Sequence, residues 1–100
     1  MIDLDRIVGF QWDQGNARKS AEKHAVSQSE AEEIFFNTPL LIVSDPDHSR
    51  SELRFHALGV TEAGRRLHVT WTLREENTLI RVISARDMSR KERTRYEQET

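Results

Sequence analysis

The sequence of 100 residues predicts one α+β domain with an antiparallel sheet, two N-terminal helices and one C-terminal helix. Three observations predict this class. Two segments with helical spacing follow a short strand-like pattern near the N-terminus. Three alternating segments then come in a row. A charged segment that opens with a helix-capping signature ends the chain. Residues 1–100 have the length of a single domain with one modest core.

The first strand and the first helix are predicted from residues 8–24. Residues 8–12, VGFQW, alternate apolar with small or polar side chains, which predicts a short strand. Asp13 is a good N-cap for a helix through about His24, in which Ala17 and Ala21 lie one turn apart. Gly15 weakens this helix, because glycine has a low helix propensity.

A second helix is expected to begin after Ser27, which stands at capping-box spacing from Glu30. Apolar residues follow at helical spacing: Ala31, Ile34 and Phe35. Residues 37–39, NTP, should end this helix, since proline cannot continue it. Residues 40–43, LLIV, then predict another strand.

Three further strands are expected at about 53–60, 66–74 and 79–86, joined by connections suited to hairpins. The central one alternates strictly, so one of its faces belongs to the core and the other is polar and carries His68. Arg54 and His56 of the preceding strand are expected on the same polar face. The side taken by Arg81 depends on loop-length parity, which the sequence leaves open.

The C-terminal helix is predicted from a second capping box, Ser89 to Glu92. Its only sizeable apolar side chain is Tyr96, with Met88 just before it. A helix without an apolar stripe is expected to lie loosely on the body or to meet a partner. Arg90 and Tyr96 are the predicted partner contacts.

The composition narrows the class of protein. Charged residues make up 32% of the chain and the mean hydropathy is −0.71, and no apolar run has the length of a membrane span. The N-terminus lacks the apolar stretch of a secretory signal, and cysteine is absent. We therefore expect a cytoplasmic protein with no membrane partner.

The charges are segregated along the chain, although the net charge is only −2. Residues 26–52 contain six acids and one base, whereas residues 81–95 contain six bases and two acids. A basic patch facing phosphates would produce this asymmetry. A solvated terminal helix is the alternative explanation.

The segment 48–54, HSRSELR, crowds charged and titratable side chains at the start of a predicted strand. Its sequence raises the question of whether it is a solvated loop or a functional site. Glu52 and Arg54 could equally form an exposed ion pair that contributes under about 1 kcal/mol to stability.

Several short motifs, in order and with compatible spacing over residues 8–97, resemble the BrnT toxins of bacterial type II toxin–antitoxin systems. The matching segments are Phe10-x-Trp12-Asp13, Lys23-His24, residues 45–49 (DPDHS), Glu52-x-Arg54-Phe55, Thr72-x-Arg74, residues 81–86 (RVISAR), Glu92-Arg93 and Tyr96-Glu97. The resemblance implies a RelE-like fold and a metal-independent ribonuclease that arrests translation. It also implies a BrnA-type antitoxin as partner, which carries a ribbon-helix-helix DNA-binding part, so that DNA is contacted only through the antitoxin.

The chain departs from the family pattern at three positions. Asn16 and Ser20 stand where the family usually has a lysine and an asparagine, so one phosphate contact is missing. Ala25 stands where a glycine usually follows Lys-His. That change costs little if residue 25 is helical, but more if it needs a positive φ.

Cleaving RNA without a metal requires proton transfer at the 2′-hydroxyl and at the 5′-oxygen, and stabilisation of charge on the phosphate. His48 and Glu52 are the predicted proton-transfer residues, and Arg54 and Arg86 complete the predicted catalytic set. The predicted RNA-phosphate contacts are Lys23, His24, Arg74, Arg81 and Arg93. No cofactor and no metal are expected.

Purely structural roles remain open for several of these residues. His24 could only end a helix, and His56 and His68 could be ordinary exposed strand residues. Trp12 and Trp71 are expected in the core, and Arg86 needs a partner at the end of a buried strand. A metal site at residues 45–48 is disfavoured, since these ligands lie too close together on one turn.

Two hypotheses from different classes follow. The first is a sequence-tolerant endoribonuclease toxin. The second is a toxin-fold protein without nuclease activity that inhibits a protein target or acts as a co-repressor with its antitoxin. Dispersed histidines and the lack of one compact triad keep the second hypothesis open. Cleavage of RNA in the presence of EDTA would distinguish them.

Overall fold

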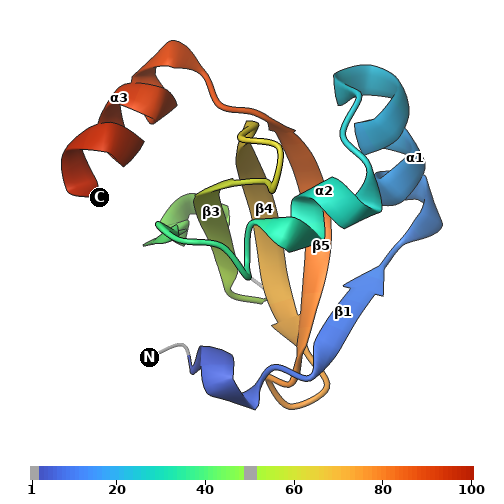
Figure 1. Ribbon diagram of the computed structural model, residues 1–100. Helices are drawn as coiled ribbons and strands as arrows, with labels where there is room; N and C mark the ends of the chain where they lie inside the picture. Colours follow the sequence, from blue (N-terminus) through green and yellow to red (C-terminus); the bar gives the residue numbers. More distant parts are fainter. Residues whose placement is uncertain (1–2, 49–51) are drawn as a thin grey trace.

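The computed structural model describes residues 3–48 and 52–100, which form a five-stranded sheet with helices on both faces (Figure 1). The strand order is β1-β5-β4-β3-β2. The strands are β1 Gly9–Trp12, β2 Leu41–Ser44, β3 Arg54–Val60, β4 Arg66–Arg74 and β5 Leu79–Asp87. The helices are α1 Gln14–His24, α2 Gln28–Glu33 and α3 Arg90–Glu99, with short 3-10 turns η1 Leu4–Arg6 and η2 Pro46–His48.

The sheet is mixed, so the prediction of an antiparallel sheet is wrong for β1. Strands β2 to β5 form the expected antiparallel series, but β1 pairs with β5 in parallel. A hairpin forces its two strands to be antiparallel, whereas a long connection allows either direction. The chain leaves β1 through α1 and α2 and reaches β2 at the opposite edge, so no hairpin sets the direction of β1.

Side-chain caps begin each of the three α-helices. The Asp13 carboxylate accepts from the backbone N–H of Asn16 at 3.1 Å. The capping boxes of Ser27 and Ser89 are both formed, with Glu30 and Glu92 as their reciprocal partners. Helix α2 ends at Glu33, earlier than the apolar spacing suggested, and residues 34–36 continue as a turn.

The main core lies between one face of the sheet and the helices α1 and α2. Trp71 is fully buried on β4, and Ile34 packs against this face from the end of α2. Gly59 lets β3 approach α2 closely, since a Cβ at this position would lie 2.8 Å from the Ile34 Cβ. The α2 segment therefore sits directly on β3.

Helix α3 is attached to the opposite face of the sheet, on the side away from α1 and α2 (Figure 1). Tyr96 and Met88 are buried against Leu58, and the Tyr96 hydroxyl donates to the Pro39 carbonyl at 2.5 Å. Our expectations of a loosely attached helix and of Tyr96 as a partner contact are therefore wrong. One aromatic side chain with a hydrogen-bonded hydroxyl anchors the helix without an apolar stripe.

Ala25 ends α1 in the left-handed conformation, with φ 53°. Its N–H reaches back to the carbonyls of Ala21 and Ser20. This is the geometry that glycine usually supplies after a helix, so the departure at Ala25 carries a conformational cost.

Among the described residues, no helix is both long and apolar enough to cross a membrane.

Candidate functional site

The polar face of the sheet, on the α3 side, collects the titratable side chains of three neighbouring strands. Arg54 lies opposite Thr72, and His56 lies opposite Thr70. His68 lies opposite Arg86 of β5. Because cross-strand partners share a face, Arg54, His56, His68 and Arg86 all lie on this side.

A β-bulge in β5 places Arg81 on this same face. Residues five apart in a regular strand point to opposite faces, so a regular β5 would separate Arg81 from Arg86. The pairing shifts between Thr70 and Trp71, so that Ser84 and Val82 face adjacent residues of β4 and one residue of β5 is left over. Arg81 consequently lies opposite Thr72.

A hollow of about 390 Å³ opens between this face and α3. It is lined by Val43, His56, Leu58, His68, Thr70, Arg86, Glu92 and Arg95. The lining thus joins two imidazoles, two guanidinium groups, one hydroxyl and one carboxylate around a single space. We take this hollow as the candidate site.

His56 is held by two hydrogen-bonding partners. Its Nε2 lies 2.9 Å from the Asp45 carboxylate, and its Nδ1 lies 3.1 Å from the Thr70 hydroxyl. A carboxylate on one ring nitrogen fixes the orientation of the ring. The ring of His68 lies beside it, with 4.7 Å between the ring centroids.

His68 is buried, with 8% of the residue exposed. Burial lowers the pKa of His68 to about 4, so the imidazole is neutral near pH 7. Its Nε2 lies 3.6 Å from Glu92, which is too long for a hydrogen bond, and its Nδ1 has no partner among the described residues. The Nδ1 of this neutral ring is therefore a buried polar atom that no described residue satisfies.

Glu92 joins α3 to the sheet face through Arg86. The guanidinium donates two parallel hydrogen bonds to the carboxylate, at 2.8 and 2.9 Å, and the Ser89 N–H donates a third at 2.8 Å. Burial by itself would raise the pKa of Glu92, but these hydrogen bonds and the nearby positive charge lower it to about 2. The hydrogen bond to Glu92 raises the pKa of Arg86. Arg86 thus has the partner that its position required.

Further arginines stand on the same face, beyond the lining of the hollow: Arg54, Arg66, Arg74 and Arg81. Arg74 pairs with Glu52 at 3.0 Å. Arg81 donates to the Gln11 side chain at 3.1 Å and lies 3.6 Å from Asp13. With Arg54 and Arg86, they form what we call the arginine face: Arg54, Arg74, Arg81 and Arg86.

Other predicted site residues lie elsewhere. Lys23 and His24 lie at the end of α1, where the His24 carbonyl accepts from Arg65 at 3.1 Å, rather than on the sheet face. Arg90 and Arg93 are exposed on α3. His48 ends η2, but its side chain and residues 49–51 lie outside the described part of the chain.

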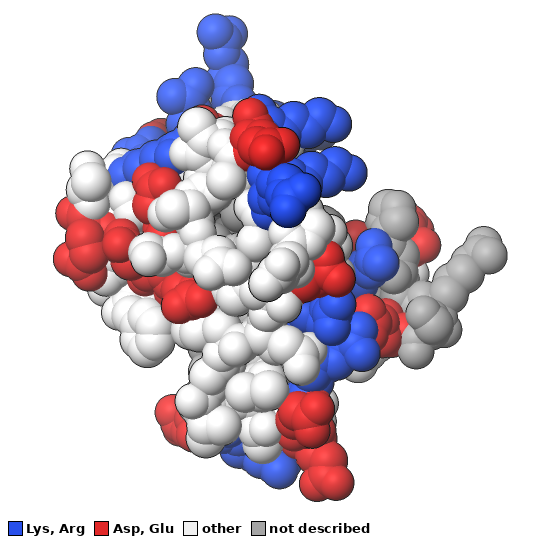
Figure 2. Space-filling model, turned by 90° about the vertical axis from the view of Figure 1, so that its right-hand side faces the viewer, with Lys and Arg blue, Asp and Glu red and all other residues white. Residues whose placement is uncertain are grey.

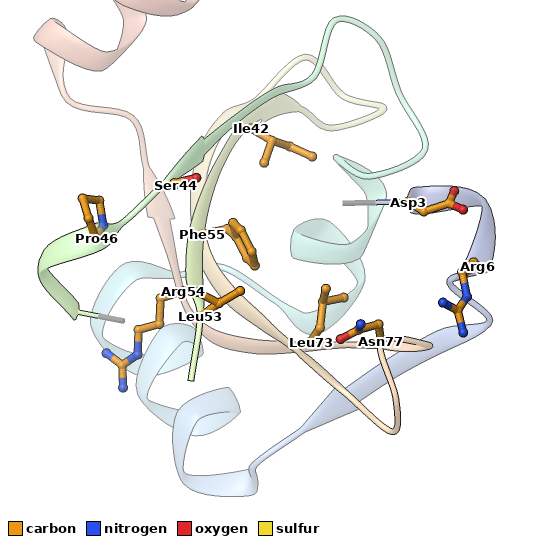
Figure 3. A pocket seen from close by; sticks show the side chains of 10 residues that line it. All are labelled: Asp3, Arg6, Ile42, Ser44, Pro46, Leu53, Arg54, Phe55, Leu73 and Asn77. Atoms are coloured by element: carbon orange, nitrogen blue, oxygen red, sulfur yellow. The ribbon is translucent and has the colours of Figure 1, made fainter. Parts of the chain in front are cut away.

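A larger cavity, of about 760 Å³, lies on the core side near η1 (Figure 3). Its walls are largely apolar, from Ile42, Leu53, Phe55 and Leu73. The Arg54 side chain points away from the other labelled side chains (Figure 3). Because none of the described residues that line this cavity is a histidine, it is a weaker candidate for proton-transfer chemistry than the smaller hollow.

Of the described polar and charged residues that line the hollow, Arg86 was predicted as functional, whereas His56, His68, Thr70, Glu92 and Arg95 were not. The alternation of β3 and β4 already placed the two histidines on one face, but each alone looked like an ordinary strand residue. The contribution of Glu92 depends on the path of α3 across the sheet, which no local pattern contains.

Among the described residues, no cluster of three His, Cys, Asp or Glu side chains could hold a metal ion.

Comparison with known proteins identifies the family and a similar fold. The model of the family described as "Ribonuclease toxin, BrnT, of type II toxin-antitoxin system" matches residues 12–92. The crystal structure of the Brucella abortus ribonuclease toxin BrnT is similar in fold, with a TM-score of 0.59 and 18% sequence identity. The alignment covers 83% of this chain and 99% of that chain. No curated protein matches the sequence significantly.

Proposed function

The chain belongs to the BrnT family of ribonuclease toxins of type II toxin–antitoxin systems, and from this membership we propose a metal-independent endoribonuclease that arrests translation. One observation carries the proposal: the four residues of the arginine face and the histidines His56 and His68 lie on one side of the sheet. Cations suit a polyanionic substrate, and imidazoles suit proton transfer near neutral pH.

The proposed reaction is an internal displacement on the RNA. The 2′-oxygen bonds to phosphorus while the bond from phosphorus to the 5′-oxygen breaks, which leaves a 2′,3′-cyclic phosphate and a 5′-hydroxyl. One group must take the proton of the 2′-hydroxyl, and another must deliver a proton to the 5′-oxygen. Charge that develops on the phosphate oxygens needs preorganised cations.

His56 is our first choice for one proton transfer. Asp45 fixes one nitrogen of its ring, and the other nitrogen faces Thr70, which also lines the hollow. A substrate hydroxyl would join or replace the Thr70 hydroxyl at this nitrogen. His48 and Glu52, predicted from the sequence, are the candidates for the second proton transfer.

Arg86 and Arg54 are the proposed phosphate clamp. Arg86 lines the same hollow as His56, and its two parallel donors match a phosphate as well as they match Glu92. Arg54 lies two residues before His56 on β3, with the buried Phe55 between them. Arg74 and Arg81 would extend RNA binding along the same face, with Lys23, His24 and Arg93 as more distant contacts.

Incubation of the purified protein with RNA in excess EDTA tests this proposal. We expect cleavage products with 2′,3′-cyclic phosphate ends, and at least a hundredfold lower rate for His56→Gln. Arg18→Gln is the control variant, because Arg18 is exposed on α1, away from the arginine face. Intact RNA at high enzyme excess would refute nuclease activity, and full activity of His56→Gln would remove His56 from the mechanism.

A second candidate function is binding without cleavage, directed at a protein target or at co-repression with the antitoxin. The ion pairs Arg86–Glu92, Arg74–Glu52 and Arg81–Asp13 favour it, because carboxylates of the same chain already partner these arginines. The EDTA assay separates the two candidates, since only the first yields cyclic phosphate ends.

We also propose a BrnA-type antitoxin as the partner of this toxin, with a ribbon-helix-helix part that contacts DNA. The toxin itself would reach DNA only through that antitoxin. The site of action would be the cytoplasm, where the RNA substrate is found. Covering the arginine face and α3 with an acidic antitoxin segment would block RNA directly.

A further inference from the structure

An apolar groove lies on the other side of the molecule, beside the edge strand β1. Its volume is about 340 Å³, and it is lined by Leu4, Ile7, Val8, Gly9, Phe10, Glu32, Phe35, Phe36 and Ile80. Two lining side chains are strongly exposed: Val8 at 80% and Phe36 at 78%. Water-exposed apolar side chains that border a common hollow mark an interaction surface more often than scattered ones do.

The strand β1 beside this groove also has one edge that pairs with no other strand of the sheet. β1 is the first strand in the order, so it has a neighbour on one side only. The Val8 N–H bonds to the Thr78 carbonyl of the β5 side at 2.8 Å. Backbone groups alternate in direction along a strand, so Phe10 and Trp12 also face β5, whereas Gly9 and Gln11 present their N–H and C=O groups outward.

The charges around the groove have one predominant sign. Asp3 and Asp5 flank Leu4, Glu33 follows Glu32, and the turn that leads to Thr78 contains Glu75 and Glu76. Arg6 is the one base within these same segments. Figure 2, which looks onto the β1 side, shows uncharged side chains over the middle of this face and acidic side chains gathered at its left. The groove therefore favours a cationic occupant.

We propose that the groove and the β1 edge receive an extended segment of the antitoxin, in which apolar side chains alternate with Lys or Arg. The segment would add a strand to the sheet by bonding the backbone of Gly9 and Gln11. Its apolar side chains would cover Phe36 and Val8, and its cations would face the surrounding acids. A second copy of this chain fits less well, because a two-fold contact would bring the same acids together.

This inference rests on the family membership, which supplies an antitoxin, and it goes beyond the nuclease proposal. The groove lies on the face of the sheet that α1 and α2 cover, opposite the arginine face. An antitoxin that holds both surfaces would contain an acidic segment for the arginine face and a separate basic, apolar segment for β1. Binding at β1 would hold the antitoxin without contacting the reacting groups.

Amide hydrogen exchange of the full-length toxin, free and bound to its cognate antitoxin, tests the strand addition. We expect the N–H groups of Gly9 and Gln11 to exchange at least tenfold more slowly in the complex. Phe10 and Trp12, which already face β5, should change much less. Unchanged exchange at Gly9 and Gln11 in a saturated complex would overturn the proposal. Protection that appears without antitoxin and grows with toxin concentration would instead assign the edge to a second copy.

Substitution of the groove gives an independent measurement. We expect Phe36→Ser to weaken antitoxin binding at least tenfold in calorimetry, while RNA cleavage in EDTA stays at the level of the parent protein. Leu53→Ser is the matched control, because Leu53 is 66% exposed but lies outside the groove, and it should alter affinity less than twofold. Equal affinities for both variants would refute the groove as a docking site. Absence of cleavage in the parent protein would refute the nuclease proposal without affecting this result.

Discussion

At the scale of single residues, the strongest expectation concerns the two arginines of the proposed clamp. We expect Arg54→Ala and Arg86→Ala each to abolish growth arrest and to lower the cleavage rate at least about a hundredfold, which corresponds to about 3 kcal/mol of lost transition-state stabilisation. Growth on induction and cleavage of RNA by the pure variants are the measurements. Undiminished toxicity of both variants would exclude them from the site.

Arg86→Ala needs a folding control, because it leaves the Glu92 carboxylate half-buried without its cation. Circular dichroism establishes whether the fold is kept. Arg86→Lys retains the charge but loses the two parallel donors, so it should fold like the parent protein and still cleave RNA poorly. Arg18→Ala, on the exposed side of α1, should behave as the parent protein.

His68 should make stability depend on pH. The folded state holds its pKa near 4, below the ordinary value of 6.5, so the unfolded chain binds the proton first as the pH falls. The stabilisation by neutral His68 is thus complete above about pH 6.5 and is lost as the pH falls through 4. Between about pH 7 and pH 4.5, we expect a loss on the order of 2 kcal/mol in the free energy of unfolding.

Urea unfolding at these two pH values measures that loss. His68→Gln should show a clearly smaller difference between them, because glutamine does not titrate. The Glu92 carboxylate, whose pKa is lowered to about 2, adds its own loss mainly below pH 4.5. An equal pH dependence in His68→Gln would mean that other groups cause the effect.

Ala25 offers the converse case, a residue whose replacement should stabilise the fold. Its φ of 53° is strained for any residue with a Cβ, and glycine adopts it freely. We expect Ala25→Gly to raise the free energy of unfolding by about 1 kcal/mol. Chemical denaturation measures this change, and Ala21→Gly, inside α1, should be destabilising by a similar amount. Lower stability of Ala25→Gly would contradict the assigned backbone conformation.

At the scale of elements, α3 links the candidate site to its proposed inhibition. The helix is anchored by Tyr96 and by the Arg86–Glu92 pair, yet its outer side is exposed and basic. We expect bound antitoxin to increase hydrogen-exchange protection in residues 89–100 and along 79–86. Protection confined to the acidic region 26–47 would contradict occlusion of the arginine face. The amides of Gly9 and Gln11 report separately on the groove.

At the scale of the whole molecule, the separation of charge should control RNA binding. The net charge is −2, so attraction to RNA has to come from the arginine face and α3 rather than from overall charge. Four phosphate contacts imply an affinity for single-stranded RNA that falls roughly 50-fold between about 50 and 200 mM salt. Fluorescence anisotropy with a labelled RNA measures this dependence. A flat dependence would show that the basic stretch is only solvated.

The local structure of this protein could be predicted from signals within short stretches of the chain. Both capping boxes, the strands β3 to β5 and the polar faces of β3 and β4 follow from residue types at short spacing. Such signals are local because hydrogen bonds at helix ends and side-chain alternation involve residues only a few positions apart. The family resemblance carried by the short motifs was likewise confirmed.

The way in which these elements meet could not be predicted from such local signals. The parallel pairing of β1, the bulge that turns Arg81 to the face of Arg86, and the return of Glu92 to the hollow all depend on contacts between distant segments. The conformation of Ala25 and the burial of Tyr96 depend on them as well. A local pattern sets the period of a strand or helix, but its register, direction and neighbours follow from the packing of the whole chain around one core.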